Sequence, residues 1–127
     1  MYIACTCTYI HICVCTYIQC YIILLYITHP VVEPTIATQP MDAVDVSLNA
    51  MVMFTVVAGG DSLSYQWFMA NGSMPIMMIP GASGATEATL TINSVTESNE
   101  GMYFCRVFND AGSVESVTVA LELCESM

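Results

Sequence analysis

The sequence predicts an all-β protein built as a two-sheet sandwich, on the basis of three observations. Short runs of alternating apolar and polar residues follow one another from about residue 34 onward. Turns rich in Gly, Pro, Asn and Asp separate these runs at intervals of about 8 to 12 residues, which is typical of β-sandwiches. No stretch of this region shows the 3.6-residue period of an amphipathic helix, so a helical domain is not expected.

The chain is predicted to contain one folded domain. Its 127 residues suit a single domain and allow a sizeable core without disulfides. We divide it into an apolar low-complexity leader or membrane segment (residues 1–30), the β domain (31–124) and a short tail (125–127).

Charge is distributed unevenly along the chain. The formal net charge is -10 at pH 7, and all eleven Asp and Glu residues follow residue 30. Arg106 is the only Lys or Arg residue in the sequence. Binding a phosphate backbone requires a basic patch, so we exclude nucleic acid as a partner. Protein partners are expected instead, and the acidic surface favours basic ones.

Residues 1–28 form an apolar stretch without any charged side chain. About 20 apolar residues suffice to span a bilayer, so membrane association through this stretch is one interpretation. No Lys or Arg flanks it to set an orientation. Most of its residues are also those encoded by alternating purine–pyrimidine triplets, as in a translated dinucleotide repeat. A repeat-derived or wrongly assigned leader is therefore the other interpretation.

The cysteines do not form a recognisable metal site. The pairs Cys5–Cys7 and Cys13–Cys15 are separated by a single residue. Structural zinc sites usually place about two to four residues between paired cysteines. We therefore predict no metal and no cofactor.

Strands are expected wherever apolar residues alternate, because alternate side chains share one face of a strand. The predicted strand faces are Val52, Phe54 and Val56; Tyr65, Trp67 and Met69; a short run over 74–79; Leu90 and Ile92, with Val95 after them; Tyr103, Cys105 and Val107; and Val117, Val119, Leu121 and Leu123.

Several of these residues carry a family resemblance. The run from Asn99 to Cys105 resembles the Asp-x-Gly-x-Tyr-x-Cys motif of immunoglobulin superfamily domains, and Trp67 stands where their strand C tryptophan would. Leu90-x-Ile92-x-x-Val95 resembles their strand E, and Val107-x-Asn109-x-x-Gly112 resembles the F–G hairpin of the intermediate (I-set) type. The resemblance covers roughly residues 34–123.

The resemblance implies an immunoglobulin-like two-sheet Greek-key sandwich with a defined structural core. Tyr103 would be the tyrosine corner, with its hydroxyl bonded to nearby backbone, and Gly101 would permit a close approach at that turn. The core residues implied are Trp67, Tyr103, Cys105, Val56 and Leu90.

The sequence departs from the family pattern at two positions. Val56 occupies the strand B position of the first disulfide cysteine, so the usual inter-sheet disulfide cannot form, and Cys105 is expected to be a buried, inert thiol. Asn99 replaces the usual Asp, and residues 79–89 lack the basic residue that this Asp commonly pairs with. Asn99 can still form hydrogen bonds in a turn.

No enzyme is predicted. His11 and His29 lie outside the domain, so its many Ser and Thr residues have no His near them to act as a base. The acid pairs 42/45 and 97/100 are interpreted as solvated turn residues.

Two features bear on binding. Asn71-Gly72-Ser73 is an N-glycosylation acceptor sequence in a predicted turn. The methionine-rich run 74–79 is either an exposed adaptable patch or core and edge-strand packing.

The resemblance implies a non-catalytic module for protein recognition or cell adhesion at the cell surface, extracellular or membrane-anchored. The alternative is a cytoplasmic structural spacer of the giant muscle-protein type, in which immunoglobulin-like domains commonly lack the disulfide. A fragment of a longer multi-domain protein is a further alternative.

Overall fold

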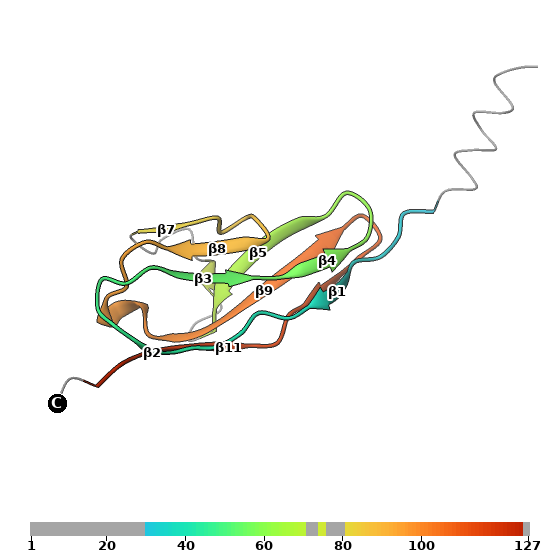
Figure 1. Cartoon of the computed structure of the whole chain (residues 1–127). Coiled ribbons are helices and arrows are strands. Elements are labelled where there is room, and N and C mark those ends of the chain that lie inside the picture. Colours follow the sequence, from blue (N-terminus) through green and yellow to red (C-terminus); the bar gives the residue numbers. More distant parts are fainter. Residues whose placement is uncertain (1–29, 71–73, 76–80, 126–127) are drawn as a thin grey trace, which may run out of the picture. The chain divides into compact units, whose positions relative to one another are not determined.

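The computed structural model describes residues 30–70, 74–75 and 81–125. These residues form two facing layers of β-sheet (Figure 1), so the predicted all-β sandwich is confirmed. The strands are β1 (Thr35–Thr38), β2 (Ala43–Val46), β3 (Val52–Thr55), β4 (Val57–Gly59), β5 (Ser64–Met69), β6 (Met74–Pro75), β7 (Ala82–Ser83), β8 (Thr89–Ile92), β9 (Gly101–Asn109), β10 (Gly112–Glu115) and β11 (Val119–Leu123). A short 3₁₀ helix, Glu97–Asn99, precedes β9.

The two layers differ in size. The larger sheet has the order β2-β11-β9-β5-β6, with β10 also paired to β9. The smaller sheet has the order β3-β8-β7, and the separate pair β1-β4 continues from the end of β3. Among the described residues, no helix is long and apolar enough to cross a membrane.

The first part of the domain contributes to both layers. Strand β1 pairs antiparallel with β4, whereas β2 pairs parallel with β11. Pro40 lies between β1 and β2 and is buried. Because proline has no backbone N–H, it cannot donate to a ladder. The β1 ladder therefore ends before Pro40, and the chain passes to the larger sheet.

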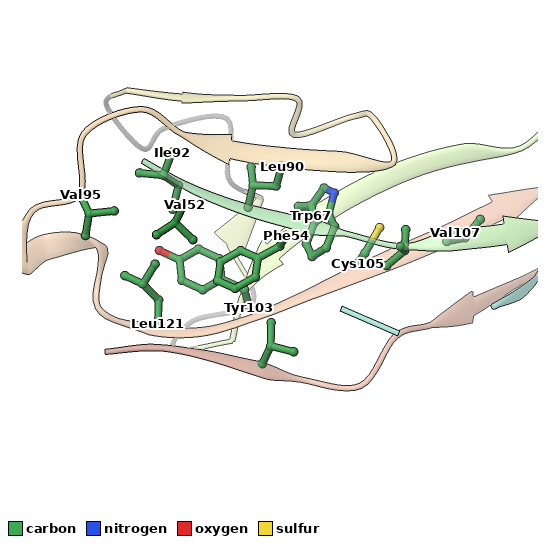
Figure 2. Packing of buried hydrophobic residues seen from close by; sticks show 12 residues of the cluster. Val52, Phe54, Trp67, Leu90, Ile92, Val95, Tyr103, Cys105, Val107 and Leu121 are labelled. Carbon is green, nitrogen blue, oxygen red and sulfur yellow. The ribbon is translucent and has the colours of Figure 1, made fainter. Parts of the chain in front are cut away.

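The core lies between the sheets and is made of the inward-facing positions of their strands (Figure 2). Three aromatic rings pack together in it: the ring of Phe54 stacks on Tyr103 with 5.4 Å between centroids, and lies 6.3 Å from the ring of Trp67. The buried hydrophobic residues are Val52, Phe54, Val56, Trp67, Leu90, Ile92, Val95, Tyr103, Cys105, Val107, Val119 and Leu121.

The last strand differs from the prediction. A single strand with Val117 on its inner face was expected, but β10 and β11 are separated at residues 116–118. Ser116 turns inward there: its backbone N–H donates to the carbonyl of Cys105 (2.8 Å), and its hydroxyl accepts from the Cys105 N–H (2.9 Å). This insertion breaks the alternation, so Val117 is exposed and its predicted inward position is wrong.

Three predicted features lie wholly or partly outside the described residues. The predicted strand over 74–79 is represented by β6, which pairs with β5 through Met69↔Met74. Residues 76–80 and the sequon Asn71-Gly72-Ser73 lie outside the described part, as does the leader up to residue 29.

Candidate protein-binding surface

Trp67 is completely buried, and both of its N–H groups find acceptors in one loop. The indole Nε1–H donates to the carbonyl of Glu87 (2.9 Å), and the backbone N–H donates to the carbonyl of Ala85 (2.8 Å). A buried indole needs such a partner because an unpaired polar group in the core is costly. The loop 84–88 therefore satisfies the polar groups of the central aromatic residue.

Gly84 fixes the path of this loop. Its φ is +75°, which residues with a side chain rarely adopt, and a Cβ placed here would lie 2.1 Å from the carbonyl oxygen of Thr89. The contact of loop 84–88 with Trp67 gives no local signal in the sequence, because it joins residues that are distant along the chain.

Tyr103 makes the hydrogen bond expected of a tyrosine corner. Its hydroxyl donates to the backbone carbonyl of Asn99 at 2.5 Å, inside the core. The Asn99 side chain is itself buried, and its Oδ1 accepts from both the backbone N–H and the hydroxyl of Thr96, each at 2.8 Å. Gly101 between them has φ +148°. The amide thus holds this turn without the ion pair usual in the family.

Cys105 is a buried thiol and Val56 is buried with it in the core. Burial raises the pKa of the Cys105 thiol to about 11, because the thiolate is disfavoured away from water. At neutral pH the nucleophilic thiolate is therefore essentially absent, and the residue acts as a small apolar group. Burial likewise raises the pKa of Tyr103 to about 12.

These two shifts predict a loss of stability in alkali. Below about pH 8, both groups are protonated in the folded and the unfolded state, so their contribution to stability is complete. As pH rises, the unfolded chain releases protons from its ordinary pKa values of 9.0 and 10.0, while the fold retains them up to about 11 and 12. The free energy of unfolding should fall across this window, by on the order of 2 kcal/mol for each group.

Urea denaturation between pH 8 and 11 measures this effect. Cys105→Ala should flatten the pH dependence of the free energy of unfolding, whereas Cys124→Ala, at an exposed thiol, should leave it unchanged. If the free energy of unfolding fell equally steeply with pH in the wild type and in Cys105→Ala, the raised pKa of the Cys105 thiol would be contradicted.

Two carboxylates interpreted as solvated turn residues also bond to the backbone of β11. Asp42 Oδ1 accepts from the N–H of Ala120 (2.8 Å), and Glu100 Oε1 accepts from the N–H of Leu123 (2.9 Å). They are exposed, but they also satisfy donors of a strand. In the described residues, no group of three His, Cys, Asp or Glu side chains could hold a metal ion.

Asn109 has a role that the sequence did not reveal. Its Oδ1 accepts from the N–H groups of Ala111 and Gly112 (2.9 and 3.1 Å), and its Nδ2 donates to the carbonyls of Val32 and Asp61 (2.6 and 2.8 Å). One amide therefore closes the β9–β10 hairpin and joins it to two distant segments.

The outer face of the larger sheet carries a cluster of aromatic residues that the sequence analysis missed. The outward positions of β9, which alternate with its buried ones, are Met102, Phe104, Arg106 and Phe108. Phe68 of β5 stacks on Phe104, with 5.1 Å between centroids and 14° between planes. We call these five residues the aromatic face. Met102 and Phe108 are each 40% exposed.

Arg106 is held in place on the aromatic face. Its guanidinium carbon lies 5.2 Å from the centroid of the Phe68 ring, and its Nη2 and Nε donate to Glu115 Oε1 at 2.6 and 3.0 Å. The pair is exposed, so it adds little to stability. The ion pair does neutralise the charge of Arg106. The rest of the aromatic face therefore consists of uncharged aromatic rings and Met102, within a domain that is acidic as a whole.

The comparison with known families decides the identity of the fold. A family profile described as immunoglobulin domain matches residues 33–109. This chain belongs to the immunoglobulin domain family. The immunoglobulin domain is non-catalytic, and the resemblance based on Trp67, Tyr103 and Cys105 is confirmed. A search of curated protein sequences found no match.

Solved structures agree with this assignment. The immunoglobulin domain is similar to a chimeric titin Z1Z2 functionalised with an exogenous decorin peptide, at 26% identity and a TM-score of 0.63, over 76% of this chain and 100% of that one. Titin domains Z1Z2 in complex with telethonin match at 24% identity and 0.63, over 78% and 52% of the chains. Extracellular domains 3–5 of Drosophila OTK match at 25% and 0.62, over 73% and 32%.

Proposed function

We propose that this immunoglobulin domain is a protein-recognition module that binds its partner through the aromatic face. The stacked pair Phe68 and Phe104, bordered by the exposed Met102 and Phe108, is the observation that supports this assignment. Aromatic residues and Met are enriched at protein interfaces, where they release water on burial. Rings can also accept a cationic side chain over their faces.

Charge defines the kind of partner. The net charge of -10 attracts basic proteins, and Arg106 is already matched by Glu115. One structural neighbour, the pair of titin domains Z1Z2, is seen in complex with telethonin, which supports protein binding by this fold. The partner proposed here is a protein with a basic, partly apolar surface.

Site-specific photo-crosslinking tests the proposed surface. Phe108→p-benzoylphenylalanine in the full chain should give covalent adducts with one or a few proteins in cells. Val57→p-benzoylphenylalanine is the matched control, because Val57 is also an exposed apolar residue but belongs to β4. Equal adducts from both positions, or none from position 108, would count against the aromatic face.

For the cellular setting we propose the cell surface, with a role in recognition or cell adhesion. Two sequence features support it: the sequon at Asn71, and the apolar stretch 1–28 that could associate with a membrane. The similarity to extracellular domains of OTK is consistent with it.

A cytoplasmic spacer is the second candidate, and the state of Cys105 favours it. The thiol is buried and free, and Val56 shares its core in place of a second cysteine, as suits a reducing compartment. The similarity to titin domains points the same way. A fragment of a longer protein would fit either setting.

Glycan analysis separates the two settings. The full chain expressed in cells should shift in mobility on endoglycosidase treatment, and Asn71→Gln should abolish the shift. A cytosolic chain without glycan would exclude the cell-surface setting while leaving the crosslinking test of the aromatic face intact.

A further inference from the structure

A groove of about 330 Å³ lies between two segments that are distant in the sequence. One segment leads into β2 and the other into β11, so the groove borders the place where these two strands begin to pair (Figure 1). Its volume is at the lower limit of the roughly 300–1,000 Å³ of ligand pockets, so it suits a single side chain rather than a larger ligand. The six residues that line the groove are Pro40, Met41, Asp42, Val117, Thr118 and Val119.

Two side chains bridge the segments on either side of the groove. Gln39 Oε1 accepts from the N–H of Val117 (2.9 Å), and Asp42 Oδ1 accepts from the N–H of Ala120 (2.8 Å). Pro40, which lies between the two bridges, has no N–H to donate. The parallel ladder of β2 and β11 begins beyond the second bridge. Because a side chain inserted between two backbones separates them by more than the roughly 4.8 Å of paired strands, a groove is left between the bridges.

The groove has an apolar floor and apolar rims. Pro40 and Val119 are buried and form the floor. Met41 and Val117 are 82% and 50% exposed and form the rims. Val117 points outward because of the extra residue at Ser116, so the irregularity that interrupts the last strand also supplies one wall of the groove. The two exposed side chains can cover the methylene groups of an entering side chain and so lose their contact with water.

Asp42 is the one charged residue that lines the groove, and no ion pair of the described residues neutralises it. Its Oδ1 accepts from the Ala120 N–H, whereas no described residue donates to its Oδ2. Arg106, the only Lys or Arg residue in the sequence, forms its ion pair with Glu115 instead. The net charge of -10 adds to this local charge, so the groove favours a cation and repels an anion.

We propose that the groove binds a lysine side chain of a partner protein. The methylene groups of the lysine would pack against Met41 and Val117. Its ammonium group would donate to the free Oδ2 of Asp42 and to the hydroxyl of Thr118. An arginine fits less well, because its bidentate pairing requires both carboxylate oxygens and one is already bonded to Ala120. The inference rests on the basic partner proposed above but not on the aromatic face, since the two surfaces share no residue.

A titration with short blocked peptides tests the proposal. The probe is N-acetyl-Ala-Lys-Ala-amide, added to the ¹⁵N-labelled full chain, and its Kd is measured from chemical-shift changes. We expect the largest changes at the amides of Met41, Thr118 and Ala120, and weaker binding at higher salt. A peptide with norleucine in place of lysine retains the stem without the charge and should have a Kd at least about tenfold higher. The peptide with arginine should have a Kd at least about threefold higher.

Two charge-matched variants distinguish the groove from the general acidity of the domain. Asp42→Asn removes the charge but keeps an oxygen that can accept from the Ala120 N–H, and it should raise the Kd of the lysine peptide at least about tenfold. Asp45→Asn removes the same charge at an exposed residue of β2 that does not line the groove, and it should change the Kd less than about twofold. Met41→Ser removes one apolar rim and should raise the Kd about threefold. Urea denaturation checks that all three variants fold.

Several results would overturn the lysine site. The lysine peptide could cause no saturable shift changes, or changes confined to the aromatic face. Equal binding of the norleucine peptide would show that the groove recognises only an apolar stem, and tighter binding of the arginine peptide would contradict the single free oxygen of Asp42. Equal effects of Asp42→Asn and Asp45→Asn would assign the binding to net charge. None of these results decides the crosslinking test at position 108, so the two proposals can fail separately.

Discussion

Trp67→Ala is expected to lower the free energy of unfolding by about 3–5 kcal/mol, as is usual when a fully buried aromatic residue is truncated. Trp67 has no exposed surface, and its ring packs against Phe54 between the sheets. The substitution would also leave the carbonyl of Glu87 without its indole donor. Domains of this size are stable by only about 5–15 kcal/mol, so the substitution would remove at least about a fifth of the stability.

Equilibrium denaturation in urea, followed by circular dichroism, measures the change. Trp67→Phe separates the two contributions, since it retains most of the ring but removes the donor to Glu87, and it should cost less than Trp67→Ala. Val57→Ala is the control at an exposed position and should change stability by less than about 0.5 kcal/mol. A loss below about 1 kcal/mol in Trp67→Ala would show that the core is not centred on this residue.

Val56→Cys is expected to stabilise the domain by forming a disulfide with Cys105. Both positions are buried in the same core, one after β3 and one on β9 of the facing sheet. Closing a loop of about 49 residues should stabilise the fold by on the order of 4 kcal/mol in the chain-entropy model. For a domain of this size, that corresponds to a rise in Tm of more than about 10 °C.

Thermal unfolding under oxidising and reducing conditions tests the disulfide. The rise in Tm should appear only in the oxidised protein, and the double variant Val56→Cys/Cys105→Ala should not show it. Thiol titration should find two fewer reactive thiols in oxidised Val56→Cys than in the same protein after reduction. If both thiols remain reactive under oxidising conditions, Val56 does not face Cys105.

Much of this fold could be predicted from local patterns. The alternation Val52–Phe54–Val56 and Tyr103–Cys105–Val107 identified strand faces that the structure buries, because the two-residue period of a strand is a property of the chain itself. The same logic failed at Val117. There the Cys105 N–H donates to the side-chain hydroxyl of Ser116 instead of to a backbone carbonyl of the neighbouring strand. The extra residue at this point shifts the alternation by one, so Val117 points outward.

The surfaces proposed for binding were the least predictable part. The aromatic face depends on the pairing of β5 with β9, which brings Phe68 onto Phe104 and Arg106 although they are distant in sequence. The methionine-rich run over 74–79, which did look like a binding patch in the sequence, lies largely outside the described residues. The proposed division into residues 1–30, 31–124 and 125–127 stays a prediction.

By itself, the sequence determined the all-β class, the family, the absence of the inter-sheet disulfide and the acidic character of the domain. Each of these follows from residue identity, short-range spacing or net charge, which are independent of the path of the chain. Only the tertiary structure decided that the carbonyls of loop 84–88 accept the N–H groups of Trp67 and that the Asn109 side chain joins three segments. These features depend on which distant segments meet, and Pro40 and the order of the strands set that arrangement in three dimensions.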